Sequence, residues 1–87
     1  MIYRVFWSER VKKDLKKLGN AEVVRIVKKV ETHLVKDPLS LGKSLTGNFS
    51  GLYRYRIGDY RVLYALKQDE LIIIVLHAGH RKDVYED

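Results

Sequence analysis

The chain has 87 residues and no cysteine, and its 17 Lys and Arg against 11 Asp and Glu give a net charge of +6. This length allows one domain, residues 1–87, and the lack of cysteine excludes a disulfide scaffold, a thiolate nucleophile and a cysteine-based zinc site. With an N-terminal apolar run too short for a signal peptide and nothing long enough to span a bilayer, we expect a cytoplasmic protein without a membrane partner.

The first half of the chain predicts a strand followed by two helices. Residues 2–7 are apolar and β-prone, with one arginine among them, which is typical of a strand. Ser8 suits a helix N-cap, and apolar residues then recur at helical spacing up to Gly19. A second amphipathic stretch follows and is expected to stop at Pro38. All of the excess positive charge lies in this half, mostly on lysines of the outer helix faces, where it predicts general attraction to polyanions.

The second half predicts a long connection and then a meander of three strands. Residues 37–51 show no sustained period and contain several glycines and serines, which is typical of a loop. Strands are predicted at 52–57, 60–67 and 71–76, separated by Gly-Asp and Gln-Asp turns. The last strand does not alternate apolar with polar residues, so we expect it to be central in the sheet and buried on both faces.

These elements predict an α+β fold in which an N-terminal strand and an antiparallel two-helix hairpin accompany a mainly antiparallel sheet that ends in the meander. The two-residue turn at 58–59 fixes the register, so that Arg56 faces Arg61 and Arg54 faces Leu63. One face of this strand pair is then rich in tyrosine and packs under the helices. The other face carries the three arginines.

Three arginines on one small face call for an anion, because like charges directly opposed across strands destabilise the pair. The alternative is that acids such as Asp83 or Glu86 fold back onto them. The stretch after the last strand is expected to bring His80, Arg81 and Tyr85 beside the same face. Because arginine binds phosphate bidentately and a tyrosine ring stacks on an unpaired base, this set favours RNA over duplex DNA.

The same residues allow RNA cleavage without a metal ion. The ribose 2′-hydroxyl would attack the adjacent phosphate, arginines would stabilise the phosphorane, and one acid and one base would move protons. Only His77, His80 and Tyr85 are candidates for the proton transfers, because arginine stays protonated. The two histidines lack a third ligand and make a poor zinc site, so no metal and no other cofactor is expected.

Two segments resemble a known family. Gly-Leu-Tyr-Arg-x-Arg-x-Gly-Asp-Tyr-Arg-Val at 51–62 and Gly-His-Arg-x-x-Val-Tyr at 79–85 are similar to the RelE toxins of the RelE/ParE superfamily, and the order of elements resembles that family over the full length. The resemblance implies an endoribonuclease, or mRNA interferase, that cuts mRNA in the ribosomal A site and inhibits translation. It also implies a cognate antitoxin, which we expect to be acidic and helical.

Site residues follow from the resemblance position by position. The family's two basic residues before the turn fall on Arg54 and Arg56, its phosphate-binding arginine on Arg61, its second catalytic arginine on Arg81 and its stacking tyrosine on Tyr85. The best-known members have lysines at the first two positions, one of them a proposed base. Because arginine cannot readily take that role, we hypothesise that His80 or Tyr85 moves the proton.

Two rival functions remain open at this point. A ParE-like protein would poison DNA gyrase through protein contacts, although such relatives generally lack the arginine set with Arg81 and Tyr85. A degenerate member would only bind an antitoxin or RNA.

Overall fold

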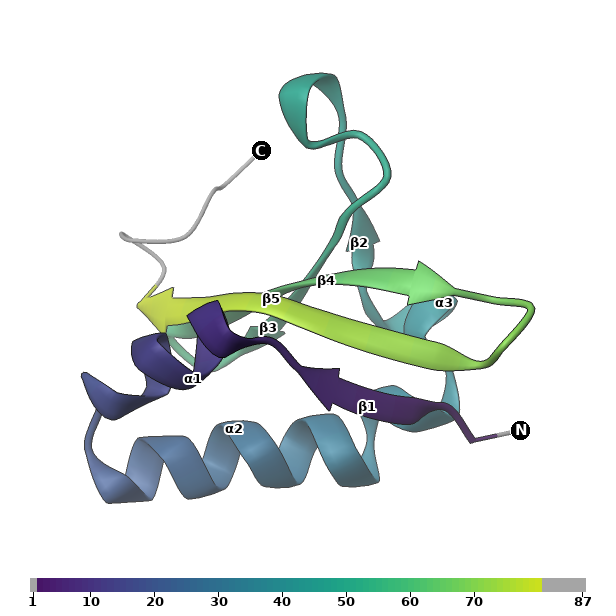
Figure 1. Ribbon diagram of the computed structural model, residues 1–87. Helices are drawn as coiled ribbons and strands as arrows, with labels where there is room; N and C mark the ends of the chain where they lie inside the picture. Colours follow the sequence, from purple (N-terminus) through teal and green to yellow (C-terminus); the bar gives the residue numbers. More distant parts are fainter. Residues whose placement is uncertain (1, 81–87) are drawn as a thin grey trace.

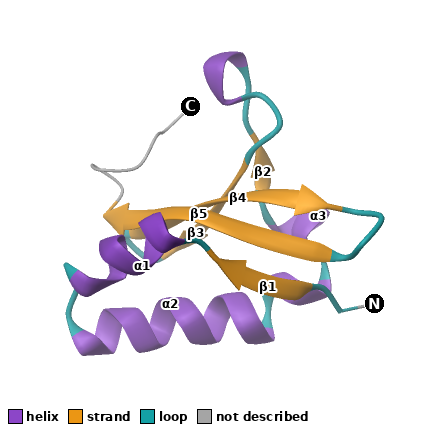
Figure 2. Ribbon diagram, in the orientation of Figure 1, coloured by secondary structure: helices purple, strands orange, loops and turns teal. Residues whose placement is uncertain are grey.

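The computed structural model describes residues 2–80, which form a five-stranded sheet with its two longer helices on one face (Figures 1 and 2). The sheet order is β1-β5-β4-β3-β2, with β1 parallel to β5 and the other pairs antiparallel. This confirms the predicted α+β class. The elements in chain order are β1 (Arg4–Trp7), α1 (Glu9–Lys16), α2 (Asn20–Thr32), η1 (Leu34–Lys36), α3 (Pro38–Leu41), β2 (Lys43–Ser44), η2 (Gly47–Phe49), β3 (Tyr53–Ile57), β4 (Tyr60–Lys67) and β5 (Ile72–His80). Within residues 2–80 no helix is long and apolar enough to cross a membrane.

Helices α1 and α3 each start at a side-chain cap. The Ser8 hydroxyl accepts a hydrogen bond from the Val11 amide at 3.2 Å, so the predicted N-cap is confirmed. Pro38 was expected to end a helix, but the preceding helix α2 already stops at Thr32, and Pro38 instead begins α3. Asp37 caps that short helix by accepting from the Ser40 amide at 3.3 Å, and proline suits a first helical position because its missing N–H has no partner there in any case.

The connection between helices and meander is more ordered than its composition predicts. Residues 37–51 contain α3, the short edge strand β2 and the turn η2. Lys43 and Ser44 pair with Arg54 and Tyr53 of β3, so this segment adds a fifth strand to the sheet. A two-residue strand is too short to give a sequence period, which is why the pattern shows only a loop.

The core lies between the helices and the tyrosine-rich face of the sheet, as predicted. Tyr64 is fully buried, and its hydroxyl donates to the Pro38 carbonyl at 2.6 Å. Its ring stacks on Tyr53 with centroids 5.5 Å apart, and Tyr55 shares a 2.6 Å hydrogen bond with His33 Nδ1. The tyrosine hydroxyls thus find partners, which a buried phenol needs.

Strand β5 is interior, as predicted, but only one of its faces is fully buried. Ile73 and Val75 face the helices and are 0% exposed, whereas Ile72 and Ile74 on the other side are half-buried. The prediction that both faces are buried is therefore wrong, because both longer helices pack on the same side of the sheet (Figure 2). The strand also continues to His80, beyond the predicted end at residue 76.

A β-bulge interrupts the pairing of β4 with β5. Leu63 pairs with His77, but the next residue, Tyr64, pairs with Val75, so Leu76 is an extra residue on β5. A bulge of this kind reverses the alternation of side chains between the two faces. His77 therefore shares a face with Leu63, where uninterrupted alternation from Val75 would have turned it toward the helices.

The buried Tyr64 predicts an alkaline loss of stability. Burial raises the pKa of Tyr64 well above its ordinary value, with a smaller contribution from the neighbouring Tyr53, Tyr55 and Asp37. The unfolded chain therefore loses this proton first, so the unfolding free energy is at its full value below about pH 10 and then falls by up to about 1.4 kcal/mol per pH unit. Urea unfolding from pH 8 to 11 measures this slope. It should be shallower in Tyr64→Phe, and an equal slope in both proteins would contradict the assignment.

Candidate active site

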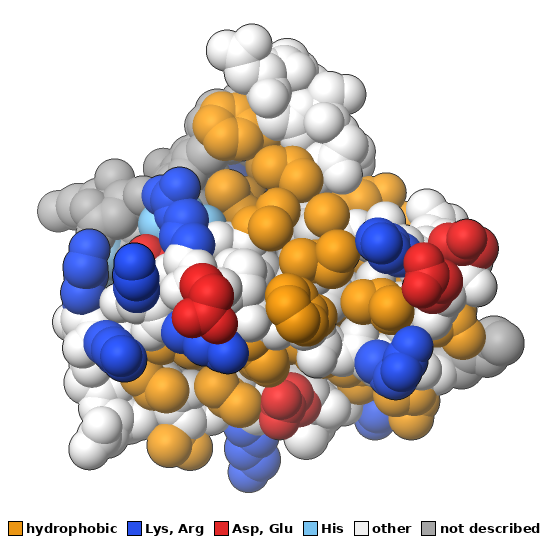
Figure 3. Space-filling model, in the orientation of Figure 1, with side chains coloured by type: hydrophobic (Ala, Val, Ile, Leu, Met, Phe, Trp, Pro, Cys, Tyr) orange, Lys and Arg blue, Asp and Glu red, His pale blue; other side chains and the backbone are white. Residues whose placement is uncertain are grey.

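The face of the sheet opposite the longer helices, here called the outer face, carries an apolar band and an arginine cluster. Figure 3 shows hydrophobic side chains spread over the middle of this view, with Lys and Arg on both flanks. Phe6 is 61% exposed and pairs with the half-buried Ile74, which in turn pairs with Ala65. These residues, with Ile72 and Leu76, form the apolar band. A solvent-facing sheet surface of this kind is typical of an interaction site.

The three predicted arginines lie together on the outer face. Arg56 is directly opposite Arg61 and Arg54 is opposite Leu63, so the predicted register is confirmed. Arg61 is only 5% exposed, Arg54 is half-buried and Arg56 is exposed. On its other side Arg61 pairs with Gly79, which contributes no side chain to this face. The arginine cluster thus runs from a buried cation, Arg61, to a solvent-exposed one, Arg56. This arrangement suits the binding of a phosphodiester on the surface of the sheet.

The structure places His80 on the opposite face from these arginines. His80 pairs with Tyr60, and the two rings meet edge to face with centroids 5.7 Å apart. Tyr60 packs against the core under the helices, and directly paired residues share a face. The bulge causes this placement. Arg81 and Tyr85, together with Asp83 and Glu86 of the alternative reading, lie outside the described residues, so their predicted roles stay predictions.

A second histidine does lie on the arginine side and is tied to a carboxylate. His77 Nδ1 is 2.5 Å from Oδ2 of Asp14, and the same oxygen accepts from the Ala78 amide at 3.1 Å. The side chains are only 17% and 12% exposed respectively. Asp14 lies on α1, which continues along the edge of β5 where β1 has ended, and its carboxylate thus satisfies an edge amide of the strand.

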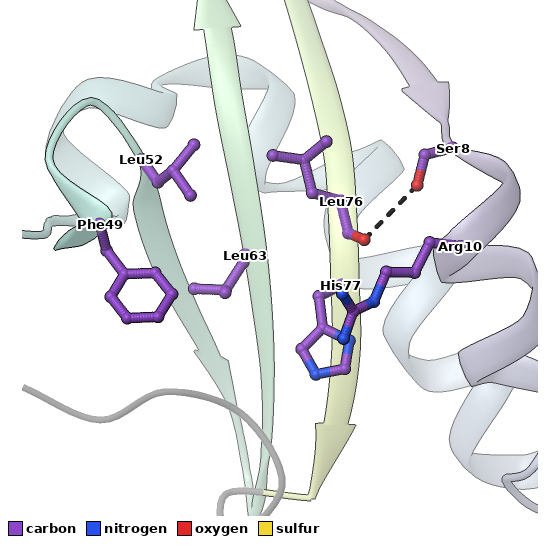
Figure 4. A pocket seen from close by; sticks show the side chains of 7 residues that line it. All are labelled: Ser8, Arg10, Phe49, Leu52, Leu63, Leu76 and His77. Atoms are coloured by element: carbon purple, nitrogen blue, oxygen red, sulfur yellow. Dashed lines mark hydrogen bonds between the residues drawn. The ribbon is translucent and has the colours of Figure 1, made fainter.

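A pocket of about 570 Å³ opens beside His77 on the outer face. Figure 4 shows its lining: loop and strand residues on one side, β5 in the middle and the start of α1 on the other. The Ser8 hydroxyl donates to the Leu76 carbonyl at 3.5 Å and holds α1 against β5. The wall is apolar on the loop side and polar on the α1 side, and its residues are Ser8, Arg10, Phe49, Leu52, Leu63, Leu76 and His77.

Asp14 is the residue of this site that the sequence interpretation missed. It lies three residues after Val11 and four before Leu18, so it belongs to the apolar stripe of its helix. A carboxylate on such a stripe is a signal for a buried partner. In the part of the chain that the structure describes, no group of three His, Cys, Asp or Glu side chains could hold a metal ion.

Comparisons of both sequence and structure find toxins of toxin–antitoxin systems. Residues 5–85 match a family described as the ParE toxin of the type II toxin–antitoxin system parDE. The toxin RelG of Mycobacterium tuberculosis is 31% identical, covering 98% of each chain. Among solved structures, the toxin–antitoxin complex RelBE2 of M. tuberculosis matches with a TM-score of 0.89 at 28% identity, over 93% of this chain and 100% of that one. The archaeal RelE–RelB complex of Pyrococcus horikoshii matches with a TM-score of 0.66 at 29% identity, over 97% and 100%.

Proposed function

This chain belongs to the RelE/ParE superfamily of toxins of type II toxin–antitoxin systems, and from that premise we propose that it is a ribosome-dependent endoribonuclease that cuts mRNA in the A site. The observation that carries the proposal is the direct opposition of Arg56 and Arg61 on a sheet face that the longer helices leave uncovered. Two guanidinium groups at directly opposed positions present a matched set of donors to a phosphate. The phosphodiester of an mRNA is the anion that a translation-blocking toxin would cleave. The proposal therefore includes a cytoplasmic location and the ribosome as a partner.

The arginine cluster supplies electrostatic stabilisation for the reaction. When the ribose 2′-hydroxyl attacks the adjacent phosphate, negative charge builds up on the phosphorane oxygens. Arg61, buried at 5% exposure, is held in a low-dielectric position where its charge acts most strongly. Arg54 and Arg56 bind the flanking phosphates in this proposal. Arg81 and Tyr85 keep the roles that the family motif predicts, phosphate binding and base stacking.

Cleavage of mRNA on purified ribosomes tests the proposal. A ribosome stalled with a defined codon in an empty A site is mixed with the purified chain, and the new mRNA ends are mapped by primer extension. We expect a cut within the A-site codon and a 2′,3′-cyclic phosphate on the upstream fragment. Growth arrest on expression without such cuts would contradict the proposal.

A gyrase poison is the second candidate, favoured by the ParE name of the matching family. It would act through protein contacts and would not need the arginine cluster. Supercoiling by purified gyrase distinguishes the two: inhibition that survives Arg61→Ala would favour this candidate. A member that only binds its antitoxin would neither cut mRNA nor inhibit gyrase.

We also propose that a cognate acidic, helical antitoxin covers the apolar band of the outer face. Both M. tuberculosis RelBE2 and P. horikoshii RelE–RelB are toxin–antitoxin complexes. At one end of the band Ile72 pairs with Arg4 on one side and Lys67 on the other, so cations flank an apolar surface that would suit an amphipathic acidic helix. An occupant there would also shield the neighbouring arginines from RNA.

Replacing Phe6 with serine should weaken antitoxin binding by about 10- to 100-fold, because burying a phenylalanine contributes about 1.5–3 kcal/mol. Val24→Ser is the matched control, since Val24 on α2 is 63% exposed against 61% for Phe6 but lies on the helix side. Titration calorimetry with the cognate antitoxin measures both. Equal losses in the two variants would contradict the placement.

A further inference from the structure

We propose that Asp14 and His77 form the proton-transfer site of the cleavage reaction, an inference that rests on the proposed ribonuclease activity. In this assignment His77 Nε2 is the general base for the ribose 2′-hydroxyl, and Asp14 is a positioning residue that acts through the imidazole. It replaces the hypothesis that His80 moves this proton, because His80 packs with Tyr60 on the helix side of the sheet.

The β-bulge brings His77 to the arginines. His77 pairs with Leu63, and Leu63 pairs on its other side with Arg54, so the three residues form one row across the outer face. Arg61 pairs with Gly79, two residues beyond His77 on the same strand. Arg61 and His77 are therefore diagonal neighbours, a relation that spans about 7–8 Å between backbones and lies within reach of long side chains. Gly79, which lies opposite Arg61, adds no side chain between them.

The hydrogen bond to Asp14 determines which nitrogen of the His77 imidazole carries the hydrogen. Nδ1 lies 2.5 Å from the carboxylate oxygen, and a carboxylate accepts, so Nδ1 carries the hydrogen. In neutral histidine the lone pair then remains on Nε2, which is the form that a general base requires. Asp14 is held in turn by the Ala78 amide at 3.1 Å, so the pair is fixed from two sides.

The pocket beside His77 has the volume and the lining for a nucleotide. The imidazole lines it from β5 and Arg10 from α1, while Phe49 and Leu52 form the facing apolar wall (Figure 4). An unpaired base fits against an aromatic and apolar wall of this kind, and Arg10 supplies a charge for the phosphate. At about 570 Å³ the pocket is within the range of small-molecule sites.

His77 Nε2 takes the 2′-hydroxyl proton, the 2′-oxygen forms a bond to phosphorus, and the bond from phosphorus to the 5′-oxygen of the next nucleotide breaks. The departing 5′-oxygen takes a proton from water, and a 2′,3′-cyclic phosphate remains on the upstream fragment. The arginine cluster stabilises the phosphorane between these events.

Single-turnover cleavage on programmed ribosomes, measured from pH 5.5 to 8.5, tests the assignment. The wild-type rate should rise with pH along a one-proton limb and then level off. His77→Gln should lower the plateau rate by about 10²- to 10⁴-fold and abolish the limb, because a positioned general base contributes about that factor. Asp14→Asn should cause a smaller loss and keep the limb.

The control variants and the rescue measurement keep the test specific. His33→Gln is the matched control, because His33 contacts Tyr55 on the helix side of the sheet. This variant should cleave mRNA at the wild-type rate. Free imidazole should restore cleavage to His77→Gly, which a purely structural role of His77 would not allow. Among residues 2–80, the charged and titratable groups around His77 are Arg10 and Asp14 of α1, Lys17 at the C-cap of that helix, Arg61 of β4 and His80 of its own strand. Lys17→Gln, measured in parallel, shows how far local charge alone moves the pH dependence of the rate.

The outcomes separate this inference from the proposed function. A wild-type chain that cuts no mRNA overturns both. A wild-type chain that cuts, with His77→Gln equally fast or with the pH limb lost only in His80→Gln, overturns the assignment of His77 and leaves the ribonuclease proposal standing. Circular dichroism confirms that each variant is folded, and the imidazole rescue decides the case if His77→Gln is poorly folded.

Discussion

Replacing Arg61 with glutamine is expected to lower the single-turnover rate of mRNA cleavage by about 10²- to 10³-fold. Arg61 is 5% exposed, lies directly opposite Arg56 and pairs with Gly79 on its other side. Removing one preorganised group that stabilises transition-state charge typically costs about this factor, and glutamine keeps a donor but not the charge. The loss should appear in the cleavage step under saturating chain, because the charge is needed most when the phosphorane forms.

Arg4→Gln is the matched control for Arg61. Arg4 also lies on the outer face, opposite Ile72, but at the far end of the apolar band from the arginine cluster. Both substitutions remove one positive charge, so they reduce long-range attraction to ribosomal RNA alike. We expect Arg4→Gln to cleave at nearly the wild-type rate once bound. Equal losses in the two variants would show that the chain needs net charge rather than a placed guanidinium.

The position of the arginines was predictable from sequence because local rules govern it. The two-residue turn at 58–59 leaves one register for β3 and β4, and this register places Arg56 opposite Arg61. The tyrosines of the same strands alternate with the arginines, so burying one face on the helices exposes the other. Residues 53–64 alone determine this register, and the observed pairing of β3 with β4 confirms it.

The histidines were not predictable, because their faces depend on a bulge. Nothing in the sequence around Val75, Leu76 and His77 marks where β5 gains its extra residue relative to β4. Without that bulge His80 would share the arginine face and His77 would not. The contact of His77 with Asp14 joins residues 63 positions apart, and only the packing of α1 along the edge of β5 creates it. The helical period marks Asp14 as a carboxylate with a buried partner, but it does not identify His77 as that partner.

The edge strand β2 is the other element that local sequence patterns did not predict. It pairs with β3, the strand that carries Arg54 and Arg56. Strand β2 exists because Lys43 and Ser44 pair with β3, directly beside Arg54. The chain can approach β3 closely here because Gly42 has no side chain: a Cβ at this position would lie 1.7 Å from the Tyr64 hydroxyl oxygen and 3.1 Å from the Arg54 carbonyl oxygen. Gly42 therefore packs between the core residue Tyr64 and strand β3, which carries Arg54 and Arg56.

Gly42→Ala is therefore expected to lower the free energy of unfolding by about 2–4 kcal/mol. Its φ of −96° is open to alanine, so the cost is steric rather than conformational. Tyr64 is fully buried and cannot swing away without giving up its 2.6 Å hydrogen bond to Pro38. Overpacking a core costs about 1–3 kcal/mol, and the lost hydrogen bond adds about 1 kcal/mol. Urea denaturation followed by circular dichroism measures the change.

A double-mutant cycle with Tyr64→Phe identifies the cause. Phenylalanine lacks the hydroxyl that the new methyl would strike, so the two substitutions together should cost less than the sum of their separate losses. The rescue should be partial, because the ring carbon Cζ of Tyr64 would still lie 2.8 Å from the added Cβ. Strictly additive losses would show that alanine at position 42 acts through the Arg54 carbonyl and the pairing of β2 with β3 instead. In that case Gly42→Ala should also displace Arg54 and slow RNA cleavage more than Tyr64→Phe does.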